Sequence, residues 1–143
     1  MTTDEYSVGK GMLRLALSCR RFQKGLAADT GLTTNEILCL LVLRSEEPGS
    51  VGELSHMLDL SLTSTSKILS KLQGKGQIER NLDVSDRRRE RVTLTPRGIG
   101  VSERLLWLSK DLAIDVLRSL PEHMRMEFAK WIEWYSVENS LHN

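Results

Sequence analysis

The residues with the clearest chemical character lie in one stretch of the chain, residues 61–97. Short hydroxyl side chains and lysines come first, and three consecutive arginines follow. The stretch holds nine lysines and arginines against four acidic residues, a net charge of +5, whereas the whole chain carries +1. A basic patch on a mildly acidic body is the charge layout expected of a protein that docks one face on phosphates. On charge alone, an ordinary solvated surface on which basic residues cluster by chance explains this stretch equally well.

No set of residues in the sequence is suited to catalysis or to metal binding. A nucleophile needs a neighbouring base and a third group that orients it, and neither such a set nor a glycine-rich phosphate loop is present. The histidines His56, His123 and His142 are scattered, and no C-x-x-C pair occurs. We therefore expect no enzymatic activity, no metal site and no cofactor.

The two cysteines, Cys19 and Cys39, both stand in apolar helical patterns, which argues against a disulfide framework. Arg20 and Arg21 follow Cys19. Nearby cations favour a thiolate and burial opposes it, so Cys19 is either a redox-sensing thiol or, as is commoner, a structural cysteine. Cys39 lies in an unbroken apolar run and is expected in the core.

Apolar periodicity predicts that one helix carries the first part of the basic stretch. Ser61 can cap this helix, which runs to about residue 73, and Gly76 suits a left-handed position after it. Its inward face would hold Thr65, Ile68, Leu69 and Leu72. The candidate binding residues at its start and on its outward face are Ser61, Leu62, Thr63, Ser64, Ser66, Lys67 and Lys71. A two-turn helix with Leu54 and Leu58 inward precedes it, after an extended entry at Val51.

Two short alternating strands are predicted next, over residues 77–83 and 91–95. Residues 84–90 between them are too charged to bury and form a hairpin tip. The charged candidates at this tip are Asp86, Arg87, Arg88, Arg89 and Arg91. Thr95 can cap a further helix, with Pro96 at its first position.

Helix, turn, helix and two-stranded ribbon follow one another in the order of a winged helix-turn-helix. A helix fits the DNA major groove, where short side chains let the backbone approach the base edges. Lys67 can reach a phosphate or a guanine, and the minor groove favours arginine. The pattern therefore predicts contact with double-stranded DNA. Winged helices also serve as protein-interaction modules, so an adaptor is the alternative.

Long helices flank this lobe. They are expected over residues 8–28, from Thr34 through the apolar run 37–43, over residues 96–120, and from Pro121 onward. The fold class is therefore mostly α with a small β-wing (α+β). Trp131, Trp134 and Tyr135 in the last helix would line a pocket or, more often for such a row, pack an interface.

The sequence resembles the MarR family of bacterial and archaeal regulators. Residues 50–55, 58–61 and 69–80 are similar to the family's helix-turn-helix, and residues 83–88 and 92–98 are similar to its wing. The most specific part is Asp86-Arg87-Arg88 followed by Leu94, Thr95 and Gly98.

This resemblance implies a homodimer joined through the terminal helices. Residues 1–47 and 98–143 would supply the N- and C-terminal dimerisation helices, and residues 48–97 would form the DNA-binding lobe. It also implies that Asp86 pairs with Arg88 and holds that arginine for the minor groove. We expect a sequence-specific regulator that represses transcription in response to a small-molecule effector, with redox sensing through Cys19 as an alternative. Activation instead of repression stays open.

Three features depart from the family pattern. Leu62 stands at an outward position where many relatives carry a polar or basic residue, and it could contact a thymine methyl group. Gln77 replaces the usual leucine after Gly76. The run from Arg87 to Arg89 makes the wing more basic than usual.

The sequence contains no apolar run long enough to span a membrane. Its start is acidic and polar, unlike a secretory signal. We therefore expect a cytoplasmic protein without a membrane partner.

Overall fold

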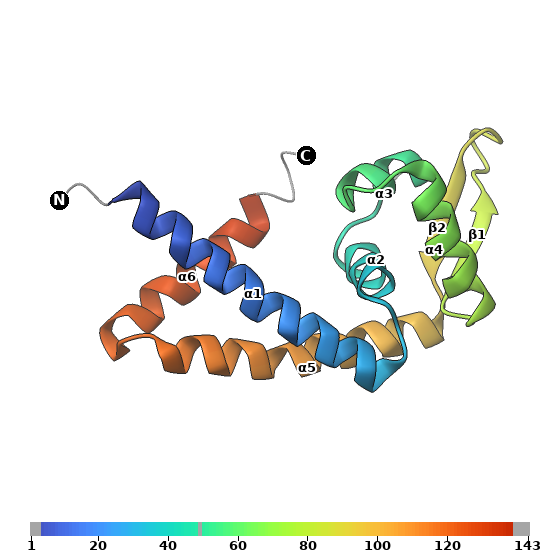
Figure 1. Ribbon diagram of the computed structural model, residues 1–143. Coiled ribbons are helices and arrows are strands. Elements are labelled where there is room, and N and C mark those ends of the chain that lie inside the picture. The colour runs from blue at the N-terminus through green and yellow to red at the C-terminus, as the bar shows by residue number, and fades with distance from the viewer. Residues whose placement is uncertain (1–3, 49, 139–143) are drawn as a thin grey trace. The chain divides into compact units, whose positions relative to one another are not determined.

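The computed structural model describes residues 4–48 and 50–138 (Figure 1). The described residues form α1 (Glu5–Thr30), α2 (Thr34–Ser45), α3 (Val51–Met57), α4 (Leu62–Gly74), β1 (Ile78–Leu82), β2 (Glu90–Leu94), α5 (Pro96–Ser119) and α6 (Glu122–Glu138). The predicted fold class, mostly α with a small β-wing, is confirmed. Residues 1–3 of the acidic start and residues 139–143 of the C-terminal segment lie outside the described residues.

The chain divides into two compact units, residues 1–34 and residues 35–143. The first unit consists essentially of α1. Asp4 caps this helix by accepting the backbone N–H of Tyr6, and Gly31 ends it in the left-handed conformation at φ 70°. A single helix cannot bury its own apolar stripe, so the apolar side chains of α1 need cover from outside their unit.

The second unit has its core where α2, α3, α4, the β-hairpin and the first half of α5 meet. The side chains of Ile37, Leu40, Leu54, Leu69, Leu72, Ile78 and Leu105 are almost fully buried there. Cys39 is completely buried, as predicted, and burial raises the pKa of its thiol to about 12. This core fixes α4 and the hairpin relative to each other.

The structure corrects the predicted start of α3. Ser50 is the N-cap, and its hydroxyl accepts the backbone N–H of Glu53 at 3.1 Å. Val51 is therefore the first helical residue and not an extended entry. The turn between α3 and α4 places Asp59 at φ 52°, a left-handed conformation that aspartate tolerates better than most residues.

The strands of the hairpin pair antiparallel, with Ile78 opposite Leu94 and Leu82 opposite Glu90. Gly76 has φ 70°, as predicted, and turns the chain from α4 into β1. Thr95 caps α5 by accepting the backbone N–H of Gly98 at 3.1 Å. A Cβ atom on Gly98 would lie 1.9 Å from the carbonyl oxygen of Gln77. The Thr95–Gly98 motif thus lets the start of α5 lie directly against the end of the α4–β1 turn.

The last helix, α6, is largely uncovered. Within residues 122–136, every residue except Phe128 is exposed, and Trp131, Trp134 and Tyr135 are about half exposed. No single helix among the described residues is long and apolar enough to cross a membrane; only α1 and α2 taken together, across the break between them, reach that length and composition.

Candidate nucleic-acid interface

The outward face of α4 is set by a cap at one end and a buried face behind. The Ser61 hydroxyl accepts the backbone N–H of Ser64 at 3.1 Å and donates to the Ser64 hydroxyl at 3.0 Å. Thr65 is fully buried, and its hydroxyl donates to the carbonyl of Ser61 at 2.9 Å. The predicted inward face is confirmed, since Ile68, Leu69 and Leu72 are buried.

The opposite face of α4 presents unengaged groups to solvent. The structure records no hydrogen bond or ion pair for the side chains of Thr63, Ser66, Lys67 or Lys71 within the described residues. A shallow groove of about 590 Å³ is lined by Leu62, Thr63, Ser66, Lys67, Ser70 and Lys71. Because the inward side chains are held in the core, the backbone of this helix keeps a fixed position. The hydrogen-bond donors on its outward face are available to a partner.

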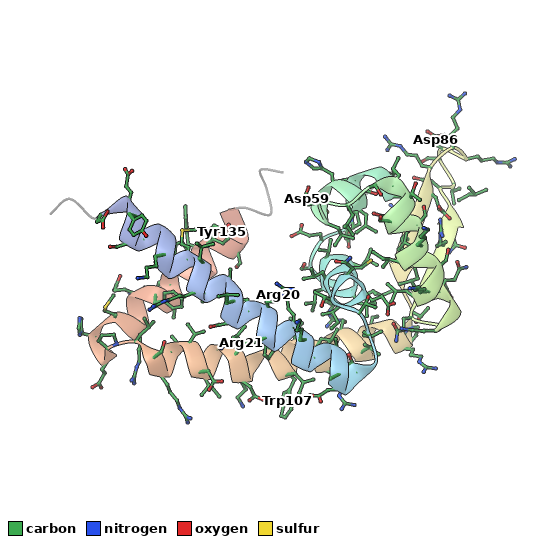
Figure 2. All side chains as sticks on the ribbon, in the orientation of Figure 1. Arg20, Arg21, Asp59, Asp86, Trp107 and Tyr135 are labelled. Carbon is green, nitrogen blue, oxygen red and sulfur yellow. The ribbon has the colours of Figure 1, made fainter. Side chains whose placement is uncertain are left out.

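The hairpin tip is shaped by two aspartates. Asp83 accepts the backbone N–H of Ser85 at 3.0 Å and the Ser85 hydroxyl at 2.9 Å. The backbone hydrogen bond, followed by that of the hydroxyl, holds the pKa of Asp83 below its usual value. Asp86 accepts the backbone N–H of Arg88 at 3.0 Å. Figure 2 shows Asp86 at the end of the hairpin, and the arginines of this tip, Arg87, Arg88 and Arg89, are exposed.

The expected ion pair between Asp86 and Arg88 is not formed. The Asp86 carboxylate binds the backbone N–H of Arg88, and none of the ion pairs of the described residues joins the two side chains. An aspartate two residues before an N–H readily closes such a local turn. Asp86 therefore shapes the backbone of the tip and leaves the Arg88 guanidinium exposed and free.

A pair that the sequence did not suggest stabilises the base of the wing. Arg80 of β1 binds Glu90 of β2 through two parallel hydrogen bonds of 2.7 and 2.8 Å. This contact raises the pKa of Arg80 and lowers that of Glu90, mainly through the side-chain hydrogen bonds. The two residues face the same side of the ribbon, two positions apart in register, and that alternation was the available signal.

A second missed pair ties α2 to the end of α4. Lys75 donates to Glu36 at 2.6 Å, and the Glu36 side chain is only 3% exposed. Lys75 is the C-cap residue of α4, so this pair joins the last turn of that helix to the core. A glutamate in the first turn of α2 carries no sequence signal for such a distant partner.

These two pairs refine the basic patch. Lys75 and Arg80 are engaged within the lobe. Within the described residues, no ion pair engages Lys67, Lys71, Arg87, Arg88, Arg89, Arg91 or Arg97. Apart from the partly exposed Ser66, every predicted site residue on α4 and the wing is exposed. Cys19, on α1, lies outside this surface and is partly buried. No His, Cys, Asp and Glu cluster within the described ranges could hold a metal.

Known proteins are similar to this chain in both sequence and fold. Residues 32–89 match the model of the MarR family. The HTH-type transcriptional repressor Rv2887 of Mycobacterium tuberculosis is 28% identical over 131 residues, covering 91% of this chain and 94% of the relative. The solved structure of the Rv2887 protein with DNA has a TM-score of 0.74 at 24% identity, covering 89% of this chain and 95% of the other.

A second structure of the Rv2887 protein, in complex with salicylic acid, has a TM-score of 0.71 at 26% identity and covers 89% of this chain and 94% of the other. The relative named above carries the name of a transcriptional repressor. The family model covers the core, the helix-turn-helix and the tip of the wing, and the alignment with the relative spans nearly all of both chains. These findings agree with the motifs from which the resemblance was first inferred. Over residues 32–89 this chain is similar to the MarR family, and its fold is similar to that of a solved MarR family structure.

Proposed function

We propose that this protein is a transcriptional repressor that binds double-stranded DNA as a homodimer and releases it when a small effector binds. The observation that carries the proposal is the union of two exposed elements on one rigid lobe. The α4 face presents free hydroxyls and lysines, and the wing beside it presents free arginines. Such a helix fits a major groove, and such a wing fits the adjacent minor groove.

The dimer is supported by the uncovered aromatic row of α6. Trp131 stacks near Phe128 at 6.3 Å and near Tyr135 at 5.3 Å between ring centroids, yet Trp131 and Trp134 remain 50% and 56% exposed. Side chains of this size contribute strongly when they are buried in an interface. We expect Trp134→Glu to yield monomers in sedimentation analysis, while Lys130→Glu on the same helix leaves the dimer intact.

The effector is proposed from the relatives. The Rv2887 protein has been solved with salicylic acid and with p-aminosalicylic acid, and we propose that this chain also answers to a small aromatic carboxylate. Salicylate should lower the affinity for DNA, and acetate at the same ionic strength should not. A ligand can shift the equilibrium only by its differential affinity for the free and DNA-bound forms. We place this activity in the cytoplasm, where the DNA of a prokaryotic cell lies.

DNA contact is tested by removing single charges and measuring affinity for the promoter region of the protein's own gene. Arg88→Ala should weaken binding about tenfold or more, since a fully engaged arginine contact is worth roughly 1–3 kcal/mol. Lys110→Ala removes the same charge from α5, outside the proposed surface, and should leave affinity unchanged. If both variants bind DNA as tightly as wild type, the wing does not contact DNA. That result would favour the alternative that the protein is a winged-helix adaptor that binds other proteins.

A further inference from the structure

Helix α4, the proposed recognition helix, carries one large apolar side chain on its exposed face. Leu62 is the first residue of α4 and is 60% exposed. The inward side chains of α4 already fill the core, so Leu62 contributes nothing to it. Leu62 forms one end of the shallow groove on this face, which continues past Thr63 and Ser66 to Lys67. An apolar group thus lies at one end of a surface that is otherwise polar and basic.

The chemistry of the major groove limits what such a group can recognise. Leucine has no donor or acceptor, so placing it against the polar edge of a guanine or cytosine would strip water from that edge without replacing the hydrogen bonds. Thymine alone among the four bases presents an apolar group in this groove, its C5 methyl. The hydroxyls of Thr63 and Ser66 beside it are free to bind neighbouring polar edges.

We propose that Leu62 is a specificity-determining residue that reads the C5 methyl group of one thymine in each half of the operator. This inference rests on the proposed DNA-binding function and adds to it a named base and a named atom. The ordered cap at Ser61 holds the first turn of α4, and therefore the backbone of Leu62, in one position. The required thymine consequently lies at a fixed place in each half-site.

The contact can be isolated because one methyl group distinguishes thymine from uracil. Duplex DNA is first selected from a random-sequence pool by the wild-type protein. Each thymine of the selected site is then replaced in turn by deoxyuridine, and affinity is measured for wild type, Leu62→Ala and Leu82→Ala. Leu82 is a matched control, since it is also an exposed leucine of the lobe, at 65% exposure. Alanine is a good helix former, so Leu62→Ala should fold, and circular dichroism checks this.

For wild type we expect one thymine per half-site whose replacement by deoxyuridine weakens binding about fourfold, the value of burying one methyl group. Leu82→Ala should keep this loss, and Leu62→Ala should abolish it. At the same position, 5-methylcytosine should bind wild type more tightly than cytosine.

Three results would overturn the inference. If no thymine shows a methyl effect, or if Leu62→Ala shows the same effect as wild type, Leu62 does not read a methyl group, although DNA binding itself stands. If wild type selects no DNA from the pool, the proposed function fails and this inference fails with it.

Discussion

Gln77 offers the sharpest test of the packing between the recognition helix and the wing. Its backbone is fully engaged, because the N–H donates to the carbonyl of Leu72 at 3.0 Å and the carbonyl accepts the N–H of Thr95 at 3.1 Å. Its side chain is different. The residue is 6% exposed, and its Oε1 atom is buried without a hydrogen-bond partner in the described part of the chain. This oxygen therefore loses water without regaining a hydrogen bond within the described residues.

Replacing Gln77 by methionine should stabilise the protein. Methionine has nearly the same length and flexibility, so it fills the same space, and it removes the unsatisfied acceptor. A buried group of this kind costs about 1–3 kcal/mol. Allowing for imperfect packing of the thioether, we expect the free energy of unfolding to rise by about 1–2 kcal/mol. For a chain of this size, the midpoint of thermal unfolding should rise by about 3–8 °C.

The assay is urea unfolding followed by circular dichroism, at one protein concentration because dimer stability depends on concentration. Gln73→Met on the exposed side of α4 is the control and should change stability by less than about 0.5 kcal/mol. A clear loss of stability in Gln77→Met, with Gln73→Met unchanged, would show that the buried oxygen has a partner such as an internal water. That outcome would refute the argument.

Three further predictions follow from the described contacts. In the same urea assay, Gly98→Ala should lower the free energy of unfolding by at least about 2 kcal/mol, because the new Cβ collides with a backbone carbonyl. Gly100→Ala, which has open space around it, is the control and should leave the free energy of unfolding unchanged. Equal stability of the two variants would contradict the close approach at Gly98. Iodoacetamide at pH 8 should alkylate Cys19 and spare Cys39 in the native protein, since Cys39 is fully buried with a pKa of about 12, and mass spectrometry should count two adducts only after unfolding. The lowered pKa of Glu90 means that its ion pair at the base of the wing contributes stability above the unfolded pKa of about 4.3 and loses it as pH falls further. Wild type should therefore lose stability more steeply below about pH 4.3 than Glu90→Gln, and parallel pH profiles would count against the pair.

The recognition helix shows why much of this fold was predictable. Ser61, Gly76 and Thr95 are residues with strong local preferences, and each occupies the cap or turn expected of it. The period of the buried residues on α4 also matched. Local rules decide these features, since a cap contacts only residues within one helical turn.

The errors lie where a second partner competes with a local rule. Val51 was expected to be an extended entry to the short helix, but the Ser50 cap starts α3 there. Asp86 was expected to bind the Arg88 guanidinium, but its carboxylate accepts the backbone N–H of the same residue. The choice between two acceptable partners depends on geometry that spacing does not contain.

The ion pair between α2 and the end of α4 was missed for a different reason, because its two residues lie far apart in the sequence. Glu36 and Lys75 are joined only after α2 and α4 pack on the common core, so no local pattern marks them. The identity of Leu62 as an exposed residue was predictable from periodicity, and its exposure is confirmed. Its role in base recognition stays a prediction.

The central claim, that the α4 face and the arginine wing bind DNA phosphates and bases, is tested most directly by a salt series. Affinity for the promoter region of the protein's own gene is measured by fluorescence anisotropy from about 50 to 200 mM salt. We predict a straight line of log affinity against log salt whose negative slope is about 0.9 per phosphate neutralised, and a shallower slope for Arg88→Ala. A flat line for wild type, or no binding at the lowest salt, would contradict the claim.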